Sequence, residues 1–280
     1  TVNVTGVVLA GADKDNYTVN LASGNNNATI SQLSSATWVG GSGSWSTAAN
    51  WAVTGNLGQT GVLPDGGNVA LAILPSTAGG VAGASTFTGL VTGYDSGFQG
   101  KLQINGGTLS VSADNFLGAA PGIAVADKIT LNGGTLQATN SFTLDANRGI
   151  TIGSGGGTFS VDASKSVNYA GIMASTGGLV KSGSGVLTLS GASTYSGGTT
   201  ISDGQLIVGG ASTALGTGAV TVSGTRLSFN TSAATSYANA FSVTGSGIFE
   251  NTGSYGITTT GGINTNLSQN VVVDGGTSGL

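Results

Sequence analysis

The stretch from Gly177 to Val208 constrains the fold of this chain more than any other. Short runs of β-forming residues, such as Leu187–Leu189 and Leu206–Val208, alternate there with Gly, Ser and Asp, which leaves no room for a helix. Side chains alternate along a strand, so Leu187 and Leu189 would lie on one face. One such turn cannot bury that face by itself. Copies must therefore stack, as they do in a β-solenoid.

The same stretch resembles the glycine-rich repeat of autotransporter passengers and large haemagglutinin-like adhesins. The matching segments are GLVKSGSG at 178–185, LTLSGA at 187–192, TYSGGT at 194–199 and GQL at 204–206. The resemblance implies a secreted protein of a Gram-negative bacterium, located outside the cell or on the outer-membrane surface. It also implies a right-handed parallel β-helix. The repeats of that family carry no catalytic residues, so the resemblance assigns no ligand.

Recurrences of this pattern predict a ladder of coils from about Val69 onward. The sequence NGGTL occurs at 105–109 and again at 132–136, and GGGTF follows at 155–159. The later analogues follow one another at intervals of 19 to 22 residues, and they are Leu187, Leu206, Leu227 and Phe249. A spacing near 20 that tolerates insertions indicates one coil per repeat with corner loops of variable length. We expect one such corner loop at 114–121.

Three regions are expected. Residues 1–22 resemble the closing strands of a β-sandwich adhesin module, residues 23–68 form a linker and a Trp-rich cap, and residues 69–280 form the parallel β-helix. The predicted fold class is thus all-β, a β-solenoid with an N-terminal Trp-containing cap and a short extra β-hairpin. An isolated hairpin is only marginally stable in water. We therefore expect the strands within 1–22 to pair with a sheet edge of the solenoid or of a neighbouring chain.

The composition supports an ordered chain and argues against several classes of function. The 280 residues include 52 Gly and 3 Pro, below the roughly 25–30% typical of disordered low-complexity chains. The net charge is −4, and the seven Lys and Arg residues are scattered, which argues against nucleic-acid binding. No apolar run of about 20 residues could cross a membrane as a helix. The chain begins at Thr1 without a signal peptide, so we expect it to be a piece of a longer protein.

The residues available for chemistry are few. The chain has no Cys and no His, which excludes histidine-based triads and ordinary zinc sites. The DKDN turn at 13–16 could suggest a calcium loop, but it lacks the distal Glu of an EF-hand, and a solvated turn is the preferred interpretation. A polysaccharide-degrading β-helix enzyme would need Asp127, Asp145 and Asp162 side by side. Since acidic residues are spread along the coils, we expect no catalysis and no metal or cofactor.

All three tryptophans, Trp38, Trp45 and Trp51, lie within 14 positions. The segment is similar to a tryptophan-rich element that precedes solenoids in large secreted adhesins. The preferred interpretation is a hydrophobic plug over the first coil, because an open solenoid end exposes core and backbone edges. The alternative is an aromatic platform for sugar rings. The chain would then be a carbohydrate-binding adhesin module for host or biofilm glycans.

The two ends of the chain suggest self-association. Apolar alternation places Val2 and Val4 near the start, and Val271 and Val273 near the end. Edges that mate head to tail without closing a ring generate filaments. The leading interpretation is therefore a secreted, structural and adhesive cell-surface β-solenoid that assembles end to end. Its expected partner is itself, with no nucleic acid and no membrane insertion.

Two finer contacts are also predicted. Asn105 and Asn132 occupy equivalent corners and could form a buried ladder of stacked amides. Asp145 and Arg148 lie three positions apart and could form a surface ion pair, worth about 0–1 kcal/mol.

Overall fold

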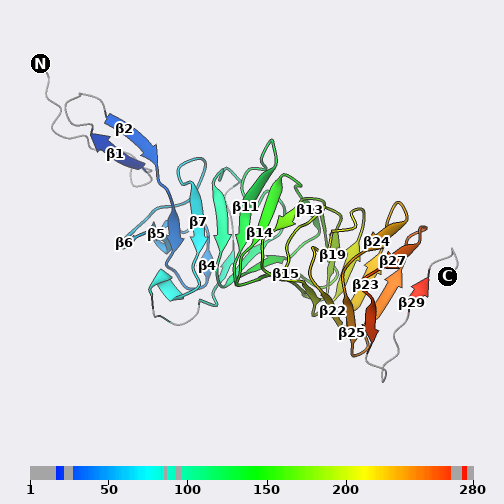
Figure 1. Ribbon diagram of the computed structural model, residues 1–280. Helices are drawn as coiled ribbons and strands as arrows, with labels where there is room; N and C mark the ends of the chain where they lie inside the picture. The colour runs from blue at the N-terminus through cyan, green and yellow to red at the C-terminus, as the bar shows by residue number, and fades with distance from the viewer. Residues whose placement is uncertain are drawn as a thin grey trace, which may run out of the picture.

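The computed structural model describes residues 17–21, 28–82, 84, 87–92, 96–265 and 273–275. These residues form short β-strands and two 3-10 turns, η2 (Ala48–Asn50) and η3 (Ala78–Gly80). The coils stack side by side along one axis, so the chain advances from the blue end to the red end of an elongated solenoid (Figure 1). The predicted all-β parallel solenoid is confirmed.

The longest sheet contains ten strands and follows the solenoid axis. Neighbouring strands come from successive coils and pair in parallel, as β10 does with β12 and β12 with β15. In order along the sheet, the strands are β4 (Gly43–Ser44), β8 (Leu90–Thr92), β10 (Thr108–Val111), β12 (Thr135–Ala138), β15 (Gly157–Val161), β18 (Leu179–Ser182), β20 (Thr199–Ile201), β22 (Val220–Ser223), β25 (Phe241–Thr244) and β28 (Ile263–Thr265).

An eight-stranded sheet forms a second side of the N-terminal coils. The β3–β5 and β5–β6 pairs are antiparallel, whereas the coils beyond them pair in parallel. After its last strand, extended backbone continues the same side, because the Thr194 amide donates to the Met173 carbonyl at 2.8 Å. The strands are β6 (Asn56–Thr60), β5 (Trp51–Val53), β3 (Ala36–Trp38), β7 (Leu71–Leu74), β9 (Lys101–Ile104), β11 (Val125–Leu131), β14 (Arg148–Ile152) and β17 (Met173–Ala174).

A seven-stranded parallel sheet forms the third side of the later coils. The last described coils contain one further short parallel pair, β24 (Thr235–Tyr237) with β27 (Ile257–Thr259). Along the chain, each of these two strands follows a strand of the seven-stranded sheet and precedes a strand of the ten-stranded sheet. The seven strands are β13 (Phe142–Leu144), β16 (Ser166–Tyr169), β19 (Val186–Leu189), β21 (Gln205–Val208), β23 (Arg226–Phe229), β26 (Ile248–Asn251) and β29 (Val273–Gly275).

The register of the strands tests the spacing read from the sequence. Leu109 pairs with Leu136, and Leu136 pairs with Phe159, as predicted. Leu187, Leu206, Leu227 and Phe249 are also successive register partners. The seven residues form two columns, because the first three lie in the ten-stranded sheet and the last four in the seven-stranded sheet. Glycine corners precede strands of both the ten-stranded and the seven-stranded sheet, so the local pattern does not show to which sheet a strand belongs.

The core lies inside the coils and follows from two-residue alternation. Strands β10, β12, β19 and β21 each alternate between half-buried and buried positions. The buried positions of successive coils stack on one another, so aliphatic and aromatic side chains form continuous columns. One column of the ten-stranded sheet departs from this rule, because Lys181 occupies the place between Phe159 and Ile201.

The N-terminal hairpin differs from the prediction. Strand β1 (Tyr17–Leu21) pairs antiparallel with β2 (Ala28–Gln32), with Leu21 opposite Ala28. Within the described residues β1 thus pairs with β2 rather than with a sheet edge of the solenoid, and its expected pairing with a neighbouring chain stays a prediction. The segment expected to be a linker supplies a nearby strand, and a hairpin between close neighbours needs little loop-closure entropy. Sheet strands also begin before residue 69, since β3 and β4 pair with β7 and β8.

Candidate functional site

The three tryptophans form one buried cluster at the N-terminal end of the solenoid, which we name the tryptophan cap. Trp38 and Trp51 are opposite one another on β3 and β5, with ring centroids 5.2 Å apart. Trp45 lies 4.4 Å from the ring of Trp51 and 5.7 Å from that of Phe98. The ring planes are inclined rather than stacked face to face, as aromatic pairs prefer.

Every indole N–H in the tryptophan cap has a backbone acceptor. Trp38 donates to the Gly41 carbonyl at 2.9 Å, Trp45 to Pro64 at 3.0 Å, and Trp51 to Trp45 at 2.8 Å. Trp38 and Trp51 are 0% exposed and Trp45 is 5% exposed. This burial disfavours the alternative of a surface platform for sugars, because stacking on a sugar needs an accessible ring face. The packing favours the plug over the first coil.

A buried arginine holds the predicted corner loop. Arg148 is 0% exposed, and its Nε lies 2.9 Å from Oδ1 of Asp114 in the loop after β10. Its guanidinium also donates to Oδ2 of Asp114 at 3.0 Å, to the Leu117 carbonyl at 2.8 Å and to the Gly118 carbonyl. One planar guanidinium with five N–H donors can satisfy several acceptors of a folded loop at once. Arg148 thus ties β14 to the loop of the preceding coil.

The predicted surface pair between Asp145 and Arg148 is wrong. Arg148 shares the two-residue alternation of Ile150 and Ile152, so its side chain enters the interior, where Asp114 is its partner. Asp145 instead accepts the Asn147 amide at 2.8 Å, which closes a local turn.

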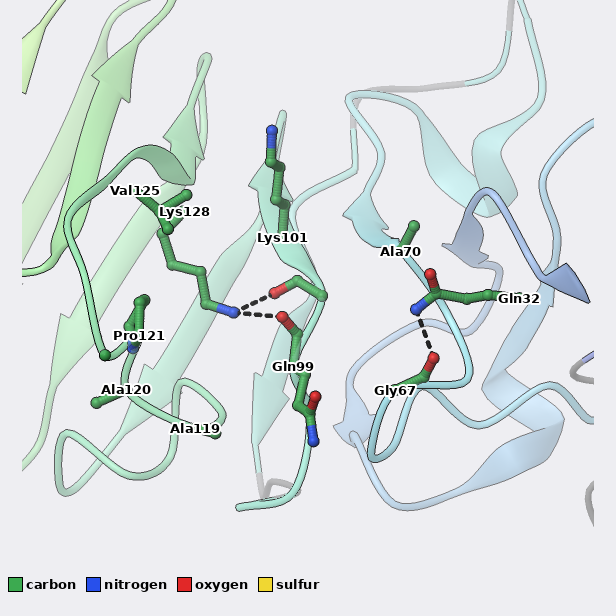
Figure 2. Close-up of a pocket in the computed structure, with 12 residues that line it drawn as sticks. Gln32, Gly67, Ala70, Gln99, Lys101, Ala119, Ala120, Pro121, Val125 and Lys128 are labelled. Carbon is green, nitrogen blue, oxygen red and sulfur yellow. Dashed lines mark hydrogen bonds between the residues drawn. The ribbon is translucent and has the colours of Figure 1, made fainter.

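A second buried cation, Lys128, lies beside a cavity between neighbouring coils. Lys128 is 5% exposed, and its Nζ donates to the carbonyls of Gln99, at 2.7 Å, and Gly100 (Figure 2). It also lies 5.8 Å from the ring centroid of Phe98. Burial, and then the nearby charge of Arg148, lower the pKa of Lys128 to about 8.

The cavity beside Lys128 has a volume of about 700 Å³. It is bounded by the starts of β9 and β11, by the corner loop after β10 and by the segment that leads into β7 (Figure 2). Its lining combines amide and ammonium groups with small apolar side chains: Gln32, Gly67, Ala70, Gln99, Gly100, Lys101, Ala119, Ala120, Pro121, Gly122, Val125 and Lys128.

A third buried cation, Lys181, lies inside the glycine-rich stretch at 177–208. Lys181 is 0% exposed, and its Nζ donates to the carbonyls of Ser182 at 2.8 Å, Gly183 at 2.6 Å and Asp203 at 3.1 Å. Burial lowers the pKa of Lys181 to about 8, and the charge of Asp203 opposes that shift. Three backbone carbonyls at one corner thus replace the water that an ammonium would otherwise bind.

Sequence reasoning did not identify the burial of these three cations, although two of them carry a signal. Arg148 alternates with Ile150, and Lys181 alternates with Leu179, so both occupy inward positions. Lys128 carries no such signal, because Lys128 and Ile129 are consecutive buried residues of the irregular strand β11.

The structure separates the carboxylates that a carboxylate-based enzyme would need together. Asp127 lies in β11, Asp145 lies between β13 and β14, and Asp162 follows β15. Within the described ranges, no group of three or more His, Cys, Asp or Glu residues could hold a metal ion. The expected absence of catalysis stays a prediction. The DKDN turn at 13–16 lies outside the described residues.

The predicted amide ladder is wrong. The side chains of Asn105 and Asn132 are only half-buried. Oδ1 of Asn105 accepts a hydrogen bond from the side-chain amide Nε2 of Gln103 at 2.9 Å, and Oδ1 of Asn132 accepts one from the backbone N–H of Gly155 at 2.8 Å. Each side chain therefore bonds to a different neighbour, which leaves no continuous stack.

The predicted self-association positions are only partly described. Val2, Val4 and Val271 lie outside the described residues. Val273 begins β29 and pairs with Phe249 of β26, so one edge of that strand is used within the chain. Across the part of the chain that the structure describes, no helix is long and apolar enough to cross a membrane.

Comparison with known proteins bears on the repeat. Residues 179–208 match the model of the passenger-associated transport repeat. This range contains β18, β19, β20 and β21, so the matched unit supplies two strands to the ten-stranded sheet and two to the seven-stranded sheet. No curated protein and no solved structure matches the chain. The resemblance read from the sequence is confirmed for this repeat, and the matched repeat together with the parallel β-solenoid fits an autotransporter-passenger-like protein.

Proposed function

We propose that this chain is a rod-like segment of a secreted bacterial cell-surface protein, located outside the outer membrane, and that its work is mechanical. The observation that carries the proposal is the parallel ladder of ten strands from β4 to β28. Each coil adds one strand spacing, about 4.8 Å, to the length of a parallel stack. Such a ladder extends in one direction without closing a ring, which suits a spacer that holds other parts away from a surface.

The tryptophan cap supports the same proposal. A stack of coils exposes apolar core and unpaired backbone at each end, so a stable rod needs a covered end. Trp38, Trp45 and Trp51 fill that place, with their indole groups bonded inside the protein. No catalytic step is proposed for the described coils. Adhesion would belong to the outward polar faces or to other segments carried by the rod.

Electron microscopy of the purified chain tests the mechanical role. Negative-stain images at several concentrations should show short rods of constant width and length. Compact globular particles would contradict the proposal. Resistance of the native rod to a broad-specificity protease at 25 °C is a second expected result, and rapid digestion under native conditions would count against it.

End-to-end assembly is a second candidate, and one observation favours it. Within the described residues, β28 and β29 each pair with a single neighbouring strand. Free strand edges template pairing with another chain. Fibres that lengthen with concentration would support assembly, and a chain lacking Thr1–Leu21 should then lose them. Unchanged fibres in that deletion would exclude the N-terminal strands from the contact.

A further inference from the structure

The cavity beside Lys128 owes its buried cation to a local irregularity of β11. Val125 pairs with Arg148 and Ile129 with Ile150, so three residues intervene on β11 where only Gly149 intervenes on β14. Such a bulge breaks the strict alternation of a strand and redirects side chains. It places Lys128 in a buried position next to Ile129. Bulges are enriched next to binding and active sites.

Among the described cations near the cavity, Lys128 differs from Lys101 and Arg148 because no carboxylate pairs with it. Lys101 has a carboxylate partner, since its Nζ lies 2.6 Å from Oδ2 of Asp127. Arg148 has Asp114 as its partner. Among the described residues, Lys128 makes hydrogen bonds only to the backbone carbonyls of Gln99 and Gly100. A buried ammonium without an anion is costly and becomes more stable when a negative charge approaches.

The lining around that ammonium suits a small polar ligand with an apolar side. Figure 2 shows the Lys128 ammonium extending toward the Gln99 backbone, while Lys101 points away from it. Pro121 and Val125 form an apolar wall, and the side-chain amides of Gln32 and Gln99 supply polar groups. A volume of about 700 Å³ falls within the range of ligand-binding cavities.

We propose that this cavity binds a carboxylate-bearing ligand, one or two sugar or amino-acid units in size, with the carboxylate held by Lys128. Lys128 is 5% exposed, so its ammonium is less screened by water than that of a surface lysine, and the ion pair is correspondingly stronger. The apolar body of the ligand packs against Pro121 and Val125. This site is separate from the tryptophan cap and from the proposed mechanical role, so either proposal can fail without the other.

Protonation of Lys128 accompanies binding. The cation that acts on it is Arg148 on β14, while Lys101 on β9 lines the same cavity and points away from it; the nearby carboxylates are Asp114 in the corner loop and Asp127 on β11. The pKa of Lys128 is about 8 in the free protein, and a bound carboxylate raises it. The ligand binds as a carboxylate to the protonated lysine, so affinity is nearly constant between about pH 5 and 7 and falls by up to about tenfold per pH unit well above pH 8.

Calorimetric titration of the whole chain with two matched pairs of probes tests the proposal. The first pair is glucuronate and glucose, and the second is acetyl-alanyl-alanine and its C-terminal amide. Each pair differs in the carboxylate, and comparison of the pairs distinguishes a sugar acid from a peptide terminus. The expected result is binding of at least one acid, with its neutral counterpart more than about tenfold weaker.

Two variants complete the test. Lys128→Met should weaken binding of the acid by more than about tenfold, because a Met of similar length fills the site without its charge. Lys165→Met removes the same charge on another coil, outside the cavity, and should bind as the wild type does. The pH profile of the wild type supplies a readout that needs no variant. Equal binding of acid and neutral probes, binding unchanged by Lys128→Met, or no binding of any probe would overturn the proposal.

Discussion

Arg148 and Asp114 form a two-point contact across 34 positions of sequence, with Nε–Oδ1 at 2.9 Å and Nη2–Oδ2 at 3.0 Å. The contact joins β14 to the corner loop of the preceding coil, and Oδ1 of Asp114 also accepts the Asp145 amide at 2.9 Å. Three segments therefore depend on one ion pair. Arg148 is fully buried in it, whereas 23% of the Asp114 side chain is exposed.

Replacement of Arg148 by Met should destabilise the chain and release the corner loop. Removing one partner of a buried ion pair costs about 3–5 kcal/mol, because the other polar groups lose their bonds. Urea denaturation should show that loss, and limited proteolysis should cut first within 113–122. Lys101→Met is the control, since its pair with Asp127 is 49% exposed on both sides and is worth about 0–1 kcal/mol. Equal losses in the two variants would contradict this account.

Lys181 should make the stability of the coils increase at alkaline pH. An unfolded lysine keeps its proton up to a pKa of 10.5, whereas the folded Lys181 releases it near pH 8. Between these values the unfolded state binds more protons, so the free energy of unfolding rises with pH. Relative to Lys181→Met, the wild type should gain up to roughly 3 kcal/mol from pH 8 to 10.5 and show no change below pH 8.

The comparison with Lys181→Met isolates that lysine. Lys128 gives a slope of the same sign, and burial raises the pKa of Tyr195, which lowers stability above pH 10. Both contributions are common to the two proteins and cancel in the difference. Parallel stability curves for the wild type and the variant would show that the ammonium of Lys181 is not held as described.

The tryptophan cap should contribute several kcal/mol to the free energy of unfolding. Trp51 is 0% exposed and contacts both other tryptophan rings, so Trp51→Ala should cost about 3–5 kcal/mol. Trp51→Phe keeps an aromatic ring and should cost less. Native tryptophan fluorescence should be blue-shifted and resistant to acrylamide, and added glycans should leave it unchanged. A red-shifted, readily quenched spectrum would place the rings at the surface.

Two glycines should differ in how much stability is lost when a methyl group is added. A Cβ at Gly177 would lie 1.8 Å from the Gly153 carbonyl oxygen of the neighbouring coil, whereas a Cβ at Gly41 would meet nothing within 4 Å. Gly177→Ala must push two coils apart, at a cost of about 1–3 kcal/mol or more. Gly41→Ala should stay within about 0.5 kcal/mol of the wild type. Thermal unfolding of the two variants checks this, and equal melting temperatures would contradict it.

The sequence predicted the stacking well because stacking depends on local pattern. The pairings of Leu109 with Leu136 and of Leu187 with Leu206 follow from corner glycines and two-residue alternation alone. The pattern did not show that these two pairs lie on different sides of the coil. That assignment depends on how many sides each coil has, which changes at β13, where the seven-stranded sheet begins.

The chemistry of the interior was less predictable. Arg148 and Lys181 occupy inward positions, where a charged residue is not expected from its charge alone. Their hydrogen-bond acceptors are backbone carbonyls and one loop carboxylate. Carbonyl positions depend on the path of the corners, which composition does not specify. Lys128 depends on a bulge in β11, and no residue type in that strand marks one. The cavity beside it was therefore beyond prediction.

In the ladder, each strand bonds only to the strands of adjacent coils, as β12 does to β10 and β15. The information that specifies a coil is thus contained in a few dozen consecutive residues and the coil before it. A chain that becomes available for folding from one end can complete its first coils while the remainder is still extended. Each finished coil then offers a template edge to the next, so folding can progress along the chain without waiting for its last residue.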